Sequence, residues 1–172
     1  MGFFTRIFGS SRDRSALLPL YQAIVAEARQ PAWYETAHVP DRMDGRFDMV
    51  ALVLSLVLLR LEREGEAGQL PSVLLTEVFI DDMDGTMREV GFGDLVVGKR
   101  VGGIMGALGG RLGAYREGAT DPAKMRTAVI RNLYRDSPPA DTGLDQALTM
   151  INALSTKITN VPLANLLAGS LA

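Results

Sequence analysis

Residues 49 to 59 read MVALVLSLVLL, and this apolar run is bounded by Asp48 and Arg60. The run is 11 residues long, whereas a helix that spans a membrane needs about 20 residues. A helix that is apolar on every side is typical of a position surrounded by other elements in the core of a domain. We therefore expect a fully buried core helix that extends from about Asp44 to Glu64.

Helical patterns continue on both sides of this run. Apolar residues recur at helical spacing from Ser15 to Arg29 and stop before Pro31, which disfavours a continuing helix. Asp121 followed by Pro122 indicates a helix start, because the carboxylate can cap free N–H groups and proline suits the first turn. Further helices are expected from Pro71, with the proline in the first turn, from Asp94 to about Glu117, from a capping box of Thr142 and Asp145, and after Pro162.

The composition agrees with a globular domain. The chain of 172 residues is 47% hydrophobic and 22% charged, which is long and apolar enough for one sizeable core. No alternating strand pattern competes with the helical one, so we expect an all-α fold, a single compact multi-helix domain of about six to seven helices. Residues 1–14 would form a basic and apolar tail or a short amphipathic helix, residues 15–136 the main helical domain, and residues 137–172 a C-terminal helical extension packed on it.

Catalytic chemistry has little support in the sequence. The absence of cysteine excludes disulfides, thiolate metal sites and cysteine nucleophiles. His38 lies in a connector without a paired nucleophile motif, so we expect a surface or hydrogen-bonding residue rather than a general base. The carboxylates at 81, 82, 84 and 89 lie beside Arg88, which is typical of a solvated or ion-paired face. We expect no enzymatic activity, no catalytic residue, and no bound cofactor or metal.

Two partial motifs lie between residues 80 and 100. The segment DDMDG resembles the start of a calcium loop, but with Gly85 at the sixth position the first ligand falls on Ile80 and the required glutamate on Gly91. The glycine and lysine spacing of residues 93–99 matches a phosphate-binding loop. Arg100, however, replaces the magnesium-binding hydroxyl, and no strand precedes the loop. We therefore expect neither calcium binding nor nucleotide hydrolysis.

Charge is distributed unevenly along the chain, although the net charge is −2. Residues 62–94 hold nine acids and two arginines, whereas residues 95–135 hold eight basic residues and two acids. One explanation is that the two segments pack side by side and neutralise each other. The alternative is a basic face for anionic lipid or nucleic acid, although direct binding to DNA is not expected.

The N-terminal segment FFTRIF is amphipathic. Phe3, Phe4, Ile7 and Phe8 share one face of a short helix. This face is expected either to contact a membrane surface or to fold back onto the core of the domain. Two helical turns bind membranes weakly by themselves, so both alternatives stay open.

Glycines recur every four residues at Gly98, Gly102, Gly106 and Gly110. Each glycine costs up to about 1 kcal/mol relative to alanine in a helix, so the row calls for a compensating contact. One explanation is tight packing against a neighbouring helix of the same domain. The other is a groove that accepts an apolar partner helix, as small-residue repeats do in membrane helices.

Four segments form a recognisable series in the chain. They are YQAIVAEARQPAWY (21–34), VPDRMDGRFDM (39–49), DDMDGTMREVGFGDLVVGKR (81–100) and GRLGAY (110–115). This series resembles the ubiquinol–cytochrome c chaperone family. The resemblance covers about Leu20 to Gly118, and its specificity lies in the combination of short motifs rather than in any one of them.

The resemblance implies a helical, non-enzymatic assembly factor. Family members assist the biogenesis of cytochrome b, the membrane core of respiratory complex III, and would bind newly made cytochrome b, often with a small helical partner protein. We interpret the matching charged residues first as a structural polar network, and alternatively as contacts to the client or partner. The matching positions are Arg46, Asp48, Asp82, Asp84, Arg88, Glu89, Gly91, Asp94 and Lys99, together with Arg111 of GRLGAY.

Localisation follows from the same resemblance. No transit peptide or secretory signal is evident, and the short chain favours a bacterial family member. We expect a cytoplasmic protein, peripheral at the inner membrane, or a protein of the mitochondrial matrix and inner membrane in a eukaryote. The alternative function is a peripheral membrane- or lipid-binding helical module without a dedicated cytochrome client, which would use the N-terminal segment and the basic half of the chain.

Overall fold

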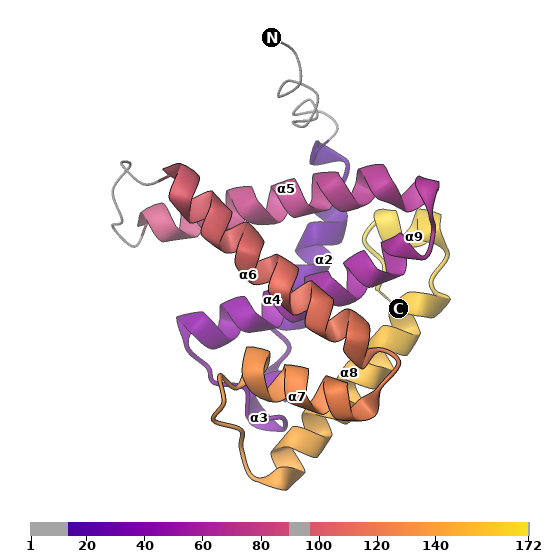
Figure 1. Ribbon diagram of the computed structural model, residues 1–172. Helices are drawn as coiled ribbons and strands as arrows, with labels where there is room; N and C mark the ends of the chain where they lie inside the picture. The colour runs from indigo at the N-terminus through magenta and orange to yellow at the C-terminus, as the bar shows by residue number, and fades with distance from the viewer. Residues whose placement is uncertain (1–13, 90–96, 172) are drawn as a thin grey trace.

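The computed structural model describes residues 14–89 and 97–171, with backbone alone for residues 87–89 and 97–100. This part of the chain is all-α and contains no strand, as the sequence predicts. None of its helices has the length and the apolar character that a membrane span requires. The helices are α2 (Leu18–Ala28), α3 (Pro31–Glu35), α4 (Met43–Glu62), α5 (Glu66–Glu89), α6 (Val97–Gly118), α7 (Pro122–Leu133), α8 (Asp141–Asn160) and α9 (Leu163–Leu167) (Figure 1).

Helix α4 forms the centre of the fold. It packs against α2, α5, α6, α7 and α8, with α5 above it and α8 below it in Figure 1. Every residue from Asp48 to Leu59 is buried, which confirms the buried core helix predicted from the apolar run. Ser55, a polar residue within this stretch, donates its hydroxyl hydrogen bond to the carbonyl of Ala51 at 2.6 Å, so its burial leaves no unsatisfied group.

Helix α7 begins as predicted. The Asp121 side chain accepts hydrogen bonds from the N–H groups of Ala123 and Lys124, and Pro122 occupies the first turn. The apolar stripe of α7 faces the core, and a short helix follows Pro162 as expected. The buried stripe consists of Met125, Val129 and Leu133.

Two helix starts were predicted wrongly. Helix α5 begins at Glu66, so Pro71 lies inside it rather than in its first turn. Proline can be accommodated there although it donates no N–H bond to the preceding turn. Helix α8 begins at Asp141 after Ala140, and no side chain caps its N-terminus, so the capping box of Thr142 and Asp145 does not form.

Candidate functional site

A buried carboxylate joins three segments at one end of α4. Asp48 is 0% exposed, and its Oδ1 atom accepts a hydrogen bond from Arg111 Nη2 of α6 at 2.7 Å. Its Oδ2 atom accepts from Arg135 Nε, which follows α7, at 2.8 Å. Arg135 also lies 3.5 Å from Asp44. A fully buried carboxylate is tolerated when it is paired and hydrogen-bonded, and here two arginines satisfy it.

We call Asp48, Arg111 and Arg135 the Asp48 cluster. An aromatic side chain and a backbone carbonyl also contact this cluster. The Arg111 guanidinium lies 5.4 Å from the centroid of the Phe47 ring, a cation–π arrangement. Arg111 also donates to the carbonyl of Ala107 at 3.1 Å. The hydrogen bond to Asp48 raises the pKa of Arg135 above its ordinary value, so the Arg135 guanidinium stays charged. The cluster therefore combines one carboxylate with two guanidinium groups.

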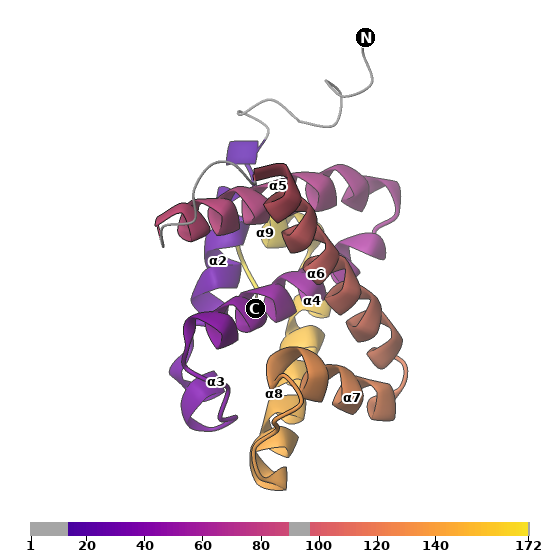
Figure 2. The ribbon, with the colours of Figure 1, turned by 60° about the vertical axis from the view of Figure 1, so that its left-hand side comes forward.

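Beside this cluster is an open groove with a volume of about 840 Å³. We call it the α4–α6 groove. Its walls come from α2, from the start of α4, from the second half of α5 and from α6. The start of α4 and the end of α5 lie on the left of Figure 1, and Figure 2 brings this side toward the viewer. The apolar lining consists of Val25, Met43, Phe47, Val50, Met83, Ile104 and Ala107.

The charged lining of the groove is predominantly basic. Five arginines and three aspartates line it, and the aspartates are engaged: Asp41 with Arg46 at 2.8 Å, Asp44 with Arg135, and Asp82 with a tyrosine hydroxyl. The groove is therefore apolar along its floor and positive along its rim. The basic residues are Arg29, Arg42, Arg46, Arg111 and Arg135.

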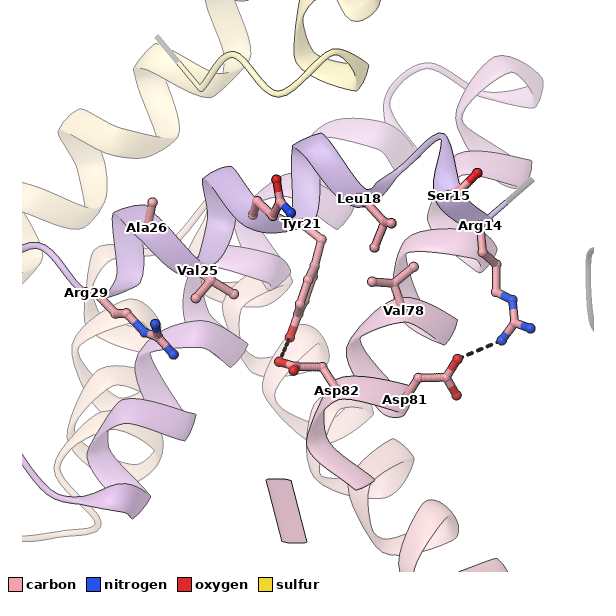
Figure 3. Close-up of a pocket in the computed structure, with 11 residues that line it drawn as sticks. Arg14, Ser15, Leu18, Tyr21, Val25, Ala26, Arg29, Val78, Asp81 and Asp82 are labelled. Atoms are coloured by element: carbon pink, nitrogen blue, oxygen red, sulfur yellow. Dashed lines mark hydrogen bonds and ion pairs between the residues drawn. The ribbon is translucent and has the colours of Figure 1, made fainter. Parts of the chain in front are cut away.

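A second cavity of about 710 Å³ lies between α2 and α5, and Figure 3 shows its lining. Tyr21 donates its hydroxyl hydrogen bond to Asp82 at 2.7 Å, and Arg14 pairs with Asp81 at the same distance. Burial, together with the bond to Asp82, raises the pKa of Tyr21, so the phenol stays protonated and keeps donating. Both cavities include Val25 and Arg29, so the two recesses meet at the C-terminal end of α2.

The described glycines of the four-residue row in α6 do not pack against a neighbouring helix. A Cβ atom built on Gly102, Gly106 or Gly110 would find no atom within 4 Å, and the same holds for Gly103 and Gly109. All five are exposed. The explanation by close packing inside the domain is therefore wrong for these residues, and the interpretation as a face for a partner helix stays a prediction. The side chain environment of Gly98 lies outside the described residues.

The structure brings together some of the charged residues singled out by the sequence. Asp48 and Arg111 form one cluster, as the polar-network interpretation requires. Arg46 is not part of this cluster; it forms an ion pair with Asp41 on the exposed surface. Asp82 lines both cavities, and Asp84 is half-buried on the same helix.

Other predicted site residues fall where the structure gives no side-chain description. These are Arg88, Glu89, Gly91, Asp94 and Lys99, and also Phe3, Phe4, Ile7 and Phe8 of the N-terminal segment.

Three arginines of the site were not predicted from the sequence. Arg135 follows α7 with a left-handed backbone φ of 50°, and its role depends on Asp48, a residue 87 positions earlier. Arg29 and Arg42 flank the groove from different helices. The one available signal was that Arg29 and Arg42 fall within the family-like segments 21–34 and 39–49.

The acidic and basic segments pack side by side where α5 meets α6. Among the described side chains, Glu62 and Arg116 join the two segments at 2.5 Å. The other arginines of the basic segment that form ion pairs in this part of the chain use acids elsewhere. Arg111 and Arg135 use the start of α4, and Arg126 uses the start of α8.

The described residues thus define an all-helical domain with an open, amphipathic groove. A family model described as Ubiquinol-cytochrome C chaperone matches residues 35–171. A solved structure, described as the crystal structure of the Cbp3 homolog from Brucella abortus, matches with a TM-score of 0.79 and 29% sequence identity. This match covers 94% of the present chain and 90% of that chain. No curated protein sequence matches significantly.

The chain belongs to the ubiquinol-cytochrome C chaperone family. The family match begins after the segment 21–34 and continues through residue 171. It therefore includes the helices α8 and α9, which the motifs of the sequence analysis did not reach.

Proposed function

We propose that the protein is a non-enzymatic assembly chaperone for the ubiquinol–cytochrome c reductase, with newly made cytochrome b as its client. The family match over residues 35–171 carries this proposal. The similarity to the Cbp3 homolog from Brucella abortus supports it over nearly the whole chain.

The α4–α6 groove fits a chaperone role on physical grounds. An unassembled membrane subunit exposes apolar surface that its partners later cover, and covering such surface is favourable by about 25 cal/mol per Å². The groove offers a recessed apolar floor, and Met43 at its edge is 61% exposed. Methionine side chains adapt to irregular partners, which suits a client that has not reached its final fold.

The place of action follows from the client. We propose that the protein works at the membrane surface where cytochrome b is inserted, as a peripheral protein. Contact with a small helical partner protein, and membrane contact through the N-terminal segment, remain predictions of the sequence analysis.

The proposal is tested by deleting the gene in its host. We expect the haem b absorbance of membranes and the level of assembled reductase to fall, while the cytochrome b transcript stays at its normal level. A tagged copy of the chaperone should recover cytochrome b from detergent-solubilised membranes. Normal reductase levels in the deletion strain would contradict the proposal.

A matched pair of variants tests the contribution of the groove. Met43→Glu places a charge at the edge of the groove, whereas Leu70→Glu places one on α5 outside both cavities. The two side chains are similarly exposed, at 61% and 63%, so neither change should disturb folding. We expect Met43→Glu to recover less cytochrome b and Leu70→Glu to behave as the unaltered protein. Equal recovery of cytochrome b by both variants would show that the client does not bind in this groove.

A further inference from the structure

Two arginines at the groove have no partner among the residues that the structure describes. The side chains of Arg29 and Arg42 form no ion pair or hydrogen bond with any described residue, and both are exposed. In Figure 3 no dashed line reaches Arg29, whereas Arg14 and Tyr21 in the same view are joined to α5. Within the described part of the chain, the groove therefore presents two cations without an acidic partner next to an apolar floor. Its charge complement is an acidic group attached to an apolar body.

The apolar part of the groove is suited to helix side chains. Met43 and Met83 line it from two sides, and Met105 on the outer face of α6 is 53% exposed. Flexible thioether side chains are characteristic of grooves that accept amphipathic helices from different partners. The volume of about 840 Å³ lies within the range typical of sites that bind compact apolar groups.

The wall formed by α6 favours a protein helix over a lipid chain. Gly103 lines the groove, and Gly102 and Gly106 are exposed on the same helix with no atom within 4 Å of a Cβ position. A bare helix backbone lets another backbone approach closely, which is how small-residue faces pair helices. A lipid tail gains little from exposed glycine, because it packs equally well against alanine or leucine.

We propose that the α4–α6 groove binds an amphipathic helix of a partner protein whose polar edge carries carboxylates, and that Arg29 and Arg42 select for this edge. The proposal deepens the proposed function by naming the kind of segment that the groove accepts, and so it rests on that function. The apolar face of the helix lies on Phe47, Val50 and Ile104. The carboxylates lie toward the guanidinium groups of Arg29 and Arg42.

The test uses the full chain and three synthetic peptides. Each peptide is an amphipathic helix with the same leucine and alanine face, and its polar edge carries glutamate, glutamine or lysine. Binding is measured by fluorescence anisotropy at low and at physiological salt. We expect the glutamate peptide to bind about tenfold more tightly than the glutamine peptide at low salt, and this preference to shrink as salt screens the charges. Equal binding of the glutamate and glutamine peptides would overturn the proposal.

Charge reversal tests the assignment of the two arginines. The double variant Arg29→Glu, Arg42→Glu should lose the preference for the glutamate peptide and bind the lysine peptide instead. Arg63→Glu is the matched control, because Arg63 is also exposed without a described partner but lies in the turn after α4. The control should keep the original preference. A double variant that still prefers glutamate would show that other residues select the ligand.

The position of the peptide is read from methionine methyl signals. The glutamate peptide should shift the signals of Met43 and Met83, which line the groove. Met125, buried between α6 and α7, should not shift. Binding that leaves Met43 and Met83 unchanged would place the peptide elsewhere and overturn the proposal.

Vesicles distinguish a lipid ligand from a protein helix. Phosphatidylcholine vesicles with and without phosphatidylglycerol are sedimented with the protein and with the double variant. Binding that requires phosphatidylglycerol and the two arginines, without peptide selectivity, would assign the groove to an anionic lipid and overturn the proposal.

The peptide experiment and the gene deletion can fail separately. Loss of cytochrome b without peptide selectivity would leave the proposed function standing and remove this inference. Peptide selectivity with normal cytochrome b would instead contradict the proposed client.

Discussion

At the scale of single residues, the molecule depends on a carboxylate that water does not reach. Asp48 is 0% exposed, and Arg111 and Arg135 supply the hydrogen bonds that compensate its desolvation. The arrangement couples the start of α4 to α6 and to the end of α7. The same cluster therefore links two of the helices that line the groove, α4 and α6.

Replacing Asp48 should therefore be costly. We expect Asp48→Asn to lower the free energy of unfolding by about 3 kcal/mol, because removing one partner of a buried ion pair leaves the other uncompensated. Arg111, whose side chain is 15% exposed, is the residue left without its counter-charge. Urea unfolding at neutral pH measures the change.

The control is the exposed pair of Glu62 and Arg116, whose side chains are 42% and 51% exposed. Glu62→Gln should cost less than about 1 kcal/mol, because water and salt already screen this pair. Similar losses in Asp48→Asn and Glu62→Gln would show that burial of Asp48 is not what makes its pair important.

At the scale of elements, the glycines of α6 and α4 differ in the space around them. The glycines on the outer face of α6 have open space where a side chain would lie. Gly45 in the first turn of α4 has none, because a Cβ atom there would collide with the carbonyl of Pro40. The first set is exposed and has room for side chains, whereas the second is required by the fold.

Alanine substitution separates these two roles. Gly106→Ala should raise the free energy of unfolding by about 1 kcal/mol, since alanine is the better helix former and meets no neighbour. Gly45→Ala should lower it by about 2 kcal/mol, because the chain before α4 has to move aside. Thermal unfolding followed by circular dichroism compares the two variants. A destabilised Gly106→Ala would show that this face is already packed in solution.

At the scale of the whole molecule, α4 organises one continuous core. It packs against α8 as well as against α2, α5, α6 and α7, so the C-terminal helices complete the core. Arg60 of α4 also donates to the carbonyl of Val161, which follows α8, at 3.4 Å. The face of α8 that is buried consists of Gly143, Leu144, Ala147, Ile151, Leu154 and Ile158.

Removal of residues 137–172 should abolish cooperative folding. Each large apolar side chain lost with α8 contributes about 1.5–3 kcal/mol by burial, and together they match the total stability of about 5–15 kcal/mol of a typical domain. The truncated chain should show a broad, non-cooperative thermal transition. A sharp transition near that of the full chain would show that residues 15–136 fold independently.

A milder pair of substitutions controls for the length of the truncation. Ile151→Asp places a charge at a fully buried position of α8, whereas Asn152→Asp changes the exposed neighbouring residue. We expect the first to destabilise the whole domain strongly and the second to leave the midpoint nearly unchanged.

Local patterns predicted the helices well and the contacts poorly. The apolar run from Met49 to Leu59 and the Asp121 cap depend on neighbouring residues, and both appear as predicted. Pro71 and Thr142 were placed wrongly because helix ends depend on packing as well as on capping residues. The candidate site was predicted in part, since Asp48 and Arg111 were singled out but Arg135 was not.

The sequence by itself determined that this chain is all-α, that its most apolar helix is central, and that it resembles the chaperone family. These properties follow from periodicity, composition and short motifs, which act over a few residues. Tertiary structure alone decided that Asp48 meets Arg135 across 87 positions, and that Gly102, Gly106 and Gly110 of α6 face outward. It also decided that Arg29 and Arg42 flank one groove without a partner among the described residues. Such pairings depend on how helices cross in space, and sequence patterns over a few residues do not determine which distant helices meet.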